Sequence, residues 1–432
     1  MSKTNSKDNG NKNSLFHFGV GWVTIIYGLL MFWFYVGMCN DGSNITVPAL
    51  AEKMGVARAD LLNTNTIAGL VGVLFFIIMG QVNHKIGARL SSGICIVISG
   101  IGYIVLGNST NVLMYTVAMC FVAGGIMSAG YIGGGGLVAQ WFPKKKGIVM
   151  GYTTMGHNLA SAFYVPLITY LVARFGITGG MLPIGIAAIV LGILGLIFIR
   201  NTPQERGINP DNVSDEVYES EYDAVTDEEG DGGWTTKKLL RTKELWQVGV
   251  TTGMFQICSA GVMTQLVLRN MELGFSQNTA ILIMTILACV GTAGSWVIGA
   301  LDLKYGTKPT MIGYGLWFMV ALLLNFTNSM PFVYISLFMI AIGIGGAANF
   351  SSSLPTSVFG RHGFNKVNSI IFPIQGAVQS MAFLVNGVTQ NLFDGQIRYA
   401  YPVLAAIALL TVILTVFIDE HKYNRDYKAA EK

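Results

Sequence analysis

Charged residues are scarce in this sequence. Asp, Glu, Lys and Arg account for 12% of its 432 residues, whereas a soluble domain carries about 25%. So few charges cannot cover a water-exposed surface, which excludes soluble enzymes and soluble binding modules. The net charge of +4 at pH 7 follows from where the lysines and arginines lie along the chain, so we expect no nucleic-acid partner.

Residues that could form a catalytic or metal centre are scarce as well. The five cysteines fall inside apolar segments without metal-ligand spacing, so we interpret them as packing residues without disulfides. The glycines at 133–136 and 343–346 also lie in apolar segments, without the lysine and hydroxyl of a nucleotide-binding loop. His157 stands alone in its span, whereas a membrane-embedded enzyme needs clustered groups. We therefore expect no enzyme, no cofactor, no metal and no use of ATP.

Long apolar runs dominate the chain instead. Hydrophobic residues make up 52% of it, the mean hydropathy is +0.54, and runs of about 20 apolar residues recur. Such runs favour helices over a barrel. We expect an all-α integral membrane protein with twelve transmembrane helices, near residues 23–50, 61–82, 89–107, 111–139, 147–173, 178–199, 245–269, 277–300, 309–327, 331–356, 367–391 and 399–418.

The basic residues are distributed asymmetrically between the loops. If both termini are cytoplasmic, all but five of the 27 lysines and arginines lie at the inner side, as the positive-inside rule requires. The five that fall outside are Lys53, Arg58, Arg174, Arg269 and Arg398. The three lysines at 144–146 follow Trp141 and mark a water-facing turn on the cytoplasmic side.

The two halves of the chain repeat each other at an offset of 219 residues. This offset places Met54-Gly55-Val56 on Leu273-Gly274-Phe275, and Ala129-Gly130-Tyr131 on Ala348-Asn349-Phe350. Two six-helix repeats are a transporter architecture, with the substrate site near the membrane midplane between them. We expect a cytoplasmic tail, a first half, a cytoplasmic linker, a second half and a second tail, at residues 1–22, 23–200, 201–243, 244–418 and 419–432.

The same offset relates two inner loops. The first carries Gly80, Lys85, Gly87 and Arg89, and its copy carries Gly299, Asp302, Lys304, Gly306 and Lys308. Both resemble the signature loop of the major facilitator superfamily. Glycine permits the tight turn, and the basic residues can hold helix carbonyls or carboxylates across the two halves. Plain positive-inside anchoring is the alternative. The family's usual acidic residue would sit at His84, so we expect no strong charge latch in the first half.

A narrower resemblance lies around the inner turn after the fourth span. Trp141-Phe142-Pro143-x-Lys145-Lys146-Gly147 is followed by Gly151 and Gly156. With TPQERG after span six, this pattern resembles the oxalate:formate antiporter branch, which is related to monocarboxylate porters. Those oxalate transporters hold a dicarboxylate with one cation in each of spans eight and eleven. The matching places here fall near Ser295 and Gln375, and both cations are absent, which argues against a dianion bound in that way.

Three ionisable residues within the spans are candidates for function. His157 lies ten residues past Gly147, about 15 Å along a helix and thus near the membrane midplane. It could bind a carboxylate or a proton, or be a neutral histidine hydrogen-bonded to a neighbouring helix. Asp41 lies towards the outer half and could carry a coupling proton, or face a water-filled vestibule. Arg269 could attract an anion, or snorkel to the outer interface and pair with Glu272.

The resemblance adds polar and aromatic candidates for the substrate pathway, each of which could instead be a packing residue. They lie on the first, fourth, seventh, tenth and eleventh spans: Tyr35, Asn40, Tyr131, Gln256, Gln265, Asn349, Phe350, Asn368 and Gln375. The linker turns from acidic to basic. We expect its acidic part to lack regular structure and its basic part to lie along the inner leaflet, with the whole acting as a tether or a regulatory segment.

These observations predict a secondary transporter that works by alternating access. We expect it to move a small organic anion, most specifically a monocarboxylate, by proton symport or by exchange for a counter-anion. Proton-coupled efflux of amphipathic or aromatic compounds is the alternative, and a non-transporting nutrient receptor is a minor one. The resemblance implies a multi-pass, lipid-embedded monomer in a bacterial plasma membrane, with both termini cytoplasmic.

Overall fold

The computed structural model describes residues 18–221, 233–360 and 363–424, and within them every regular element is a helix. Ten described segments are long and apolar enough to cross a membrane. One of these, Ile148–Phe198, bends at Gly176 (φ 70°, ψ 174°) and holds two spans. The mostly buried helix α11 (Lys243–Met263) supplies one more. The expected twelve spans and all-α membrane fold are confirmed.

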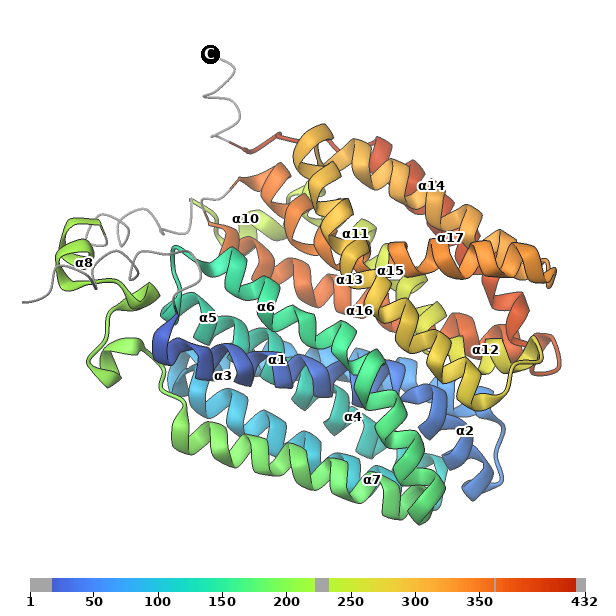
Figure 1. The fold of residues 1–432 in the computed structure, drawn as a ribbon. Helices are drawn as coiled ribbons and strands as arrows, with labels where there is room; N and C mark the ends of the chain where they lie inside the picture. The colour runs from blue at the N-terminus through green and yellow to red at the C-terminus, as the bar shows by residue number, and fades with distance from the viewer. Residues whose placement is uncertain (1–17, 222–232, 361–362, 425–432) are drawn as a thin grey trace, which may run out of the picture.

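The first half contains spans one to six and forms the lower bundle in Figure 1. It is built from α1 (Trp22–Val36), η2 (Gly37–Asp41), α2 (Ser43–Met54), α3 (Arg58–Gly107), α4 (Val112–Ser128), η3 (Ala129–Gly134), α5 (Gly135–Trp141), α6 (Lys146–Leu159), η4 (Ala160–Tyr164) and α7 (Val165–Phe198). Helix α3 contains two spans joined at Gly87, and α7 contains the end of span five and all of span six.

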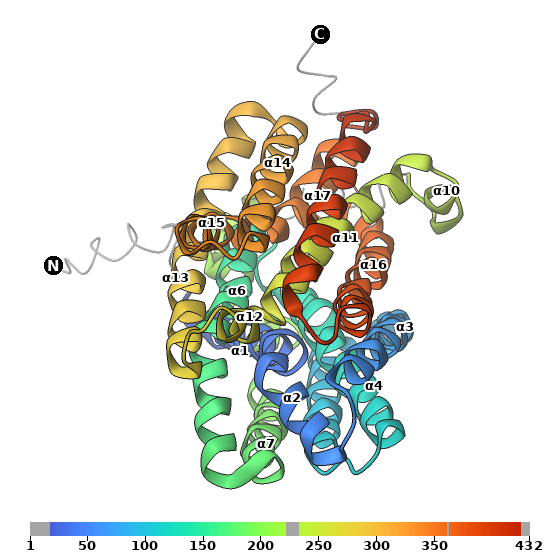
Figure 2. The ribbon, with the colours of Figure 1, turned by 90° about the vertical axis from the view of Figure 1, so that its right-hand side faces the viewer.

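The second half contains spans seven to twelve and forms the upper bundle. It is built from α11, α12 (Leu266–Glu272), α13 (Gln277–Tyr305), α14 (Thr307–Phe326), α15 (Met330–Phe359), α16 (Phe364–Leu392), η7 (Ile397–Tyr399) and α17 (Ala400–Val416). Helix α16 packs along α3, and α13 packs against α6 and η4, so the halves meet along these elements (Figure 2). We call the side of Gly87, Gly306 and the linker the inner end, and the opposite side the outer end; their assignment to cytoplasm and exterior stays a prediction.

The two repeated inner loops turn in the same way. Gly87 has φ 82° and ψ 163°, and its repeat partner Gly306 has φ 89° and ψ 162°. A side chain disfavours this positive-φ conformation, so glycine is required at both turns. The guanidinium of Arg89 donates to the carbonyl of Leu196 (Nε–O 2.9 Å), and Lys308 Nζ donates to the carbonyl of Ile418 (2.9 Å). Both basic residues hold a backbone carbonyl at or just after the last span of their own half.

Each repeat also ends with a side chain that caps the helix after this turn. In the first half, Asn201 Oδ1 accepts from the backbone N–H of Arg89 (2.9 Å). In the second half, Glu420 Oε1 accepts from the backbone N–H groups of Thr307 (3.0 Å) and Lys308 (3.3 Å). Asn201 and Glu420 are themselves 219 residues apart, so the offset seen in the sequence extends to the caps.

The remaining loop candidates lie at the inner end without such contacts. Lys85 and Lys304 are exposed, and the ammonium of Lys304 lies 5.0 Å from the ring centroid of Tyr305. Gly80 and Gly299 lie within α3 and α13. Asp302 makes no side-chain hydrogen bond or ion pair with the described residues. Charge pairing across the halves at this end therefore stays a prediction.

The linker is attached to both halves. After η5 (Pro203–Arg206), η6 (Pro210–Asn212) brings the buried Asp211 to the inner turn, where its carboxylate accepts from the backbone N–H groups of Lys144 (2.9 Å) and Lys145 (3.1 Å). The expectation of no regular structure in the acidic part is wrong at α8 (Asp215–Glu221). The rest of that part, 222–232, lies outside the described residues.

The basic part of the linker and the tail after span twelve pack together under the second half. The basic part of the linker contains α10 (Thr236–Leu240). Trp234 comes just before α10, and its ring centroid lies 5.4 Å from that of Phe359 and 5.2 Å from that of Tyr423. Tyr423 also donates to Glu244 at the start of α11 (3.2 Å). Contact of this region with the lipid surface stays a prediction.

We expect the two caps to differ in strength, because Glu420 is charged and accepts three hydrogen bonds, the third from Ser357 Oγ (2.7 Å). Glu420→Ala should cost about 1–3 kcal/mol of stability, and Asn201→Ala about 1 kcal/mol. The measurement is the thermal unfolding midpoint of the purified protein in detergent. Glu216→Ala, on the exposed face of α8, is the control. A midpoint for Glu420→Ala no lower than that of the control would contradict this account of the caps.

Candidate functional site

Three π-helical segments interrupt the first half. They are η2 in span one, η3 in span four and η4 in span five, and no π-helical segment occurs in the described part of the second half. A π-helical turn holds one extra residue, so it changes which side chains face inward, and such turns are frequent at functional sites. Asp41 lies in η2, Tyr131 in η3 and Ser161 in η4, while His157 lies in the last turn of α6, which η4 follows.

His157, Tyr35 and Tyr131 meet near the middle of the protein, as part of one aromatic cluster. The ring of Phe32 lies 4.8 Å from that of His157 and 5.1 Å from that of Tyr131, in edge-to-face geometry. Tyr35 lies 6.1 Å from His157 and 5.8 Å from Tyr131. These four residues and Phe372 are called the aromatic cluster below. Edge-to-face pairs contribute about 0.5–1.5 kcal/mol each beyond their burial, so the cluster holds spans one, four and five in register.

Phe372 connects the cluster to the second half. It lies on α16, and its ring centroid is 5.7 Å from that of Tyr131. Asn368 and Gln375 lie one turn before and one turn after it, so all three share one face of the helix. Asn368 is 3% exposed and Gln375 is 7% exposed. The aromatic cluster therefore lies where the two halves meet, with two buried amides on the same helix face.

Several buried polar atoms around this cluster have no hydrogen-bond partner among the described residues. They are His157 Nε2, Asn368 Nδ2 and Oδ1, and Gln375 Oε1. A buried polar atom without a partner costs about 1–3 kcal/mol, so such a group is expected to face a ligand or water. The alternative for His157, a neutral ring hydrogen-bonded to a neighbouring helix, is not supported at Nε2, because that atom has no hydrogen-bond partner among the described residues.

Asp41 lies on the same span as Tyr35, six residues further along the chain. It is 3% exposed, and its carboxylate accepts a hydrogen bond from Ser161, which joins η2 to η4. No lysine or arginine of the described chain pairs with it. Asn40, the preceding residue, is half-buried. The exposed vestibule position considered for Asp41 is not what the structure shows, because the carboxylate is enclosed.

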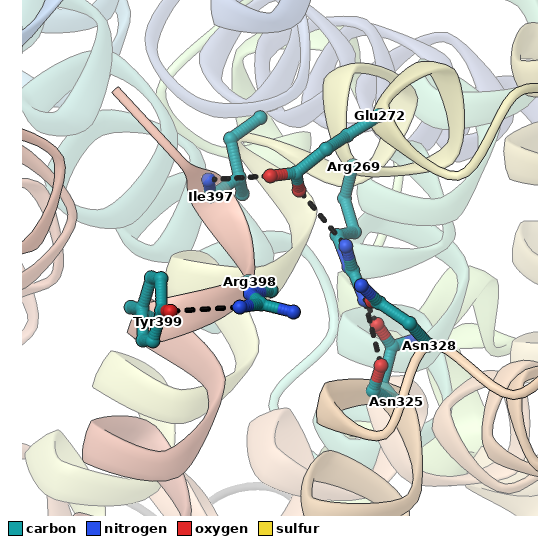
Figure 3. A network of polar contacts seen from close by, with 7 residues as sticks. All are labelled: Arg269, Glu272, Asn325, Asn328, Ile397, Arg398 and Tyr399. Atoms are coloured by element: carbon teal, nitrogen blue, oxygen red, sulfur yellow. Dashed lines mark hydrogen bonds and ion pairs between the residues drawn. The ribbon is translucent and has the colours of Figure 1, made fainter. Parts of the chain in front are cut away.

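Arg269 is fully buried, so the interpretation in which it snorkels to the outer interface is not what the structure shows. Figure 3 shows the polar network around it. Its guanidinium donates to Asn325 Oδ1 (2.9 Å) and to the Asn325 carbonyl (2.7 Å), and it also donates to Asn328. It pairs with Glu272 (2.9 Å), as expected. Helix α11 ends at Met263, and the separate helix α12 begins at Leu266. Arg269 therefore lies on the short helix α12, and its side chain packs inside the second half.

The other candidates on spans seven and ten lie within the second half. Gln256 donates to Ser351 (3.3 Å), and Asn349 donates to the carbonyl of Ser295 (2.8 Å). Gln265 accepts from Gln390. Phe350 is fully buried, 5.2 Å from Tyr314 and 5.9 Å from Phe255 between ring centroids. The structure does not bring these four residues into the aromatic cluster, and their pathway roles stay predictions.

Sequence reasoning missed Phe32 and Phe372. Phe32 is three residues before Tyr35 and therefore on the same face of α1, and Phe372 is four residues after Asn368, so helical spacing from the named candidates could have found both. The contact between Tyr131 and Phe372 joins residues of different halves, and no spacing within one span indicates it.

Comparison with known proteins agrees with this architecture. The family model described as "Major Facilitator Superfamily" matches residues 23–383. The chain belongs to the major facilitator superfamily. It is similar over its whole fold to the solved D-xylose-proton symporter, with a TM-score of 0.69 at 14% identity, covering 93% of this chain and 98% of the other. Like its relatives in this family, it is a transporter-type membrane protein and not an enzyme.

The names of curated relatives state different substrates. An uncharacterized MFS-type transporter of Escherichia coli (strain K12), YhjX, is 21% identical over 81% of this chain and 84% of its own length. The glycerol-3-phosphate transporter of Bacillus subtilis (strain 168) is 24% identical over 50% of each chain. The oxalate:formate antiporter of Oxalobacter formigenes is 26% identical over 34% of this chain and 30% of its own. The last two matches span half or less of the relatives' lengths.

We expect Arg269 to be an anchor for α12. Arg269→Ala should lower stability by about 2–4 kcal/mol, because it leaves Glu272 and the buried Asn325 without their partner. The measurement is the thermal unfolding midpoint in detergent. Arg174→Ala, at an exposed outer position, is the matched control. If Arg269→Ala unfolds at the same temperature as the control, the buried network does not stabilise the protein.

Proposed function

We propose that this protein is a secondary active transporter of a small organic anion, most specifically a monocarboxylate, and that it moves this solute across the plasma membrane by alternating access. The observation that carries the proposal is the aromatic cluster at the contact between the halves, with unpartnered polar atoms of both halves around it. Transporters of this architecture bind their solute near the midplane between the repeats.

The charge of the site favours a singly charged solute. The stretches that contribute to it, residues 22–52, 90–143, 147–173 and 367–397, contain no lysine and no arginine. Tight recognition of a phosphate ester or a dicarboxylate uses guanidinium or ammonium groups. A monocarboxylate needs fewer donors, and His157 Nε2 and Asn368 Nδ2 are unpartnered nitrogens that can supply them. The likeness to the oxalate:formate antiporter supports a carboxylate, whereas the likeness to the glycerol-3-phosphate transporter does not match this lack of cations.

Two buried groups could couple transport to protons. His157 can take up a proton with the anion, since the pair is then neutral overall. Asp41 is enclosed without a cation partner in the described chain, and burying an unpaired charge is costly, so it suits a proton carrier. Exchange against a second anion needs neither group to titrate. Proton symport and anion exchange therefore remain the two mechanisms of this proposal.

The aromatic cluster also supports a second candidate, proton-coupled efflux of amphipathic or aromatic compounds. Four of its five side chains are phenylalanine or tyrosine, and such a surface accepts flat apolar molecules. A receptor role is a minor alternative: the membrane sensor protein UhpC of Escherichia coli (strain K12) is 25% identical over 51% of this chain and 48% of its own length.

Counterflow in proteoliposomes tests these functions. We expect saturable uptake of a labelled monocarboxylate from a panel of formate, acetate, lactate, oxalate, aromatic carboxylates and neutral analogues. Uptake that rises with an inward proton gradient would indicate symport, and uptake that needs an anion on the far side would indicate exchange. Movement of aromatic compounds without any carboxylate would favour efflux. Binding of a solute without counterflow would favour the receptor.

His157 should be required for transport but not for folding. We expect His157→Ala to reduce the uptake rate at least about tenfold, because a hydrogen bond to a charged group contributes about 1.5–3 kcal/mol. Thr154→Ala is the matched control, since that hydroxyl lies one turn earlier and donates only to its own helix, to the carbonyl of Met150 (2.8 Å). Uptake by His157→Ala equal to that of the control, with unchanged pH dependence, would remove His157 from the site.

A further inference from the structure

The seventh span is broken between two helices. Helix α11 ends at Met263, and α12 begins at Leu266, with Gln265 at φ −133° between them. In a continuous α-helix, the N–H of Val267 would donate to the carbonyl of Met263, four residues earlier. Before the break Thr264 donates to Ala260 (3.0 Å), at the break Gln265 donates only three residues back, to Val262 (3.1 Å), and after it Arg269 donates to Gln265 (2.8 Å).

The side-chain amide of Asn44 occupies the place of the missing bond. Its Oδ1 accepts from the N–H of Val267 (3.0 Å), and its Nδ2 donates to the carbonyl of Met263 (2.7 Å). Asn44 thus inserts one amide between the two backbone groups that would otherwise bond each other, which is a recognised cause of a helix break. Nδ2 also donates to the carbonyl of Asp41 (2.9 Å), and the residue is 1% exposed.

Asn44 belongs to the other half of the protein. It lies on α2, in span one, and its partner Met263 is 219 residues further on, at the equivalent position of the second repeat. The contact therefore lies where equivalent positions of the two halves meet. Any movement that separates spans one and seven at this level must withdraw the amide from the break.

This contact is one of several that close the outer end. The guanidinium of Arg58, at the outer start of α3, donates to Gln390 near the outer end of α16 (Nε–Oε1 2.8 Å). Further along the same two helices, Gly387 faces Asn63 and Gly69 faces Ser380 so closely that a Cβ at either glycine would clash. Asn158 meets Thr292 near the middle (3.2 Å). The structure shows the state in which the halves are joined from the middle to the outer end.

We propose that Asn44 controls the opening of the outer end. While the end is closed, its amide keeps the seventh span broken. When the end opens, Asn44 withdraws, and the Val267 N–H bonds the Met263 carbonyl, so that α11 and α12 become one helix. Both backbone groups are paired in each state, which avoids the several kcal/mol that an unpaired polar group costs in an apolar environment. The inference goes beyond the proposed substrate and needs only the two-half architecture.

Two substitutions should act in opposite directions. Asn44→Ala removes the inserted amide and leaves Val267 free to bond Met263, so it should favour the continuous helix and the open outer end. Val267→Pro removes the N–H that Asn44 Oδ1 accepts in the closed state and that the continuous helix needs in the open state, at a first-turn position of α12 where proline is tolerated. In the continuous helix the proline ring would in addition clash with the Met263 carbonyl, which outweighs the loss of one hydrogen bond to Asn44. Val267→Pro should therefore preserve the break and keep the outer end closed. A general loosening of the fold would move both variants in the same direction.

The measurement is the labelling rate of Ser380→Cys by a membrane-impermeant maleimide added from outside. Ser380 is 8% exposed and lies against Gly69 across the halves, and the full-length background has its five native cysteines replaced. We expect labelling about 2- to 10-fold faster with Asn44→Ala, the range that one net hydrogen bond supplies, and slower with Val267→Pro. Ser43→Ala is the matched control, because Ser43 Oγ bonds only its own helix, at the carbonyl of Cys39 (3.2 Å).

The outcomes of this experiment either support or overturn the proposed role of Asn44. Opposite shifts of the two variants, with the control at the parent rate, would establish Asn44 as the outer-gate residue. Rates equal to the parent in both variants, or shifts in the same direction, would overturn the proposal. If Asn44→Ala does not give a monodisperse protein, Val267→Pro alone still tests it, since labelling at or above the parent rate contradicts it. No transported solute enters the assay, so its failure is separate from failure of the monocarboxylate proposal.

Discussion

A backbone amide inside a lipid bilayer has no water to bond, so each N–H and carbonyl must find its partner within the protein. The long helices of this chain satisfy that requirement by themselves. The places where the helix changes are therefore the informative ones: the π-helical segments η2, η3 and η4, and the break after Met263. The first three surround the aromatic cluster, and the fourth is paired by Asn44 from the other half. The candidate site and the proposed gate both lie where the regular hydrogen-bond pattern is interrupted.

The positively charged groups of the protein, like its backbone groups, are paired where they are buried. The basic residues are concentrated at the inner end. Among the residues that the structure describes, the one fully buried arginine, Arg269, is bound by Glu272 and by the amide groups of Asn325 and Asn328 (Figure 3). Around the aromatic cluster, the described residues present the imidazole of His157 and neutral amides, and further along span one lies the enclosed carboxylate of Asp41. Such a centre provides hydrogen bonds and one or two exchangeable protons, and it provides little permanent positive charge.

Much of this could be predicted from the sequence, because hydropathy and loop charge report directly on membrane spans, and a constant offset reports on a repeat. His157, Tyr35 and Tyr131 could be named as candidates from the sequence, because polar and ionisable side chains within a span suggest a functional role, and the structure places their rings together. Side-chain direction was not predictable. Phe350 is the repeat partner of Tyr131, yet it packs inside its own half. The break near Gln265 coincides with a contact from Asn44 in another span, which spacing within span seven cannot indicate.

The caps at the inner end also have a consequence for the order in which the two halves fold during synthesis. Asn201 and Asp211 come soon after the sixth span in the sequence. Their side chains accept hydrogen bonds from backbone N–H groups at the inner turns of the first half. That half thus contains everything needed to finish its own inner surface before span seven is synthesised, and domains generally fold as units in the order of synthesis. Glu420 and Tyr423 follow span twelve, so the second half acquires its cap only after all of its spans exist. During biosynthesis, the second half is therefore the one that waits uncapped beside a completed neighbour.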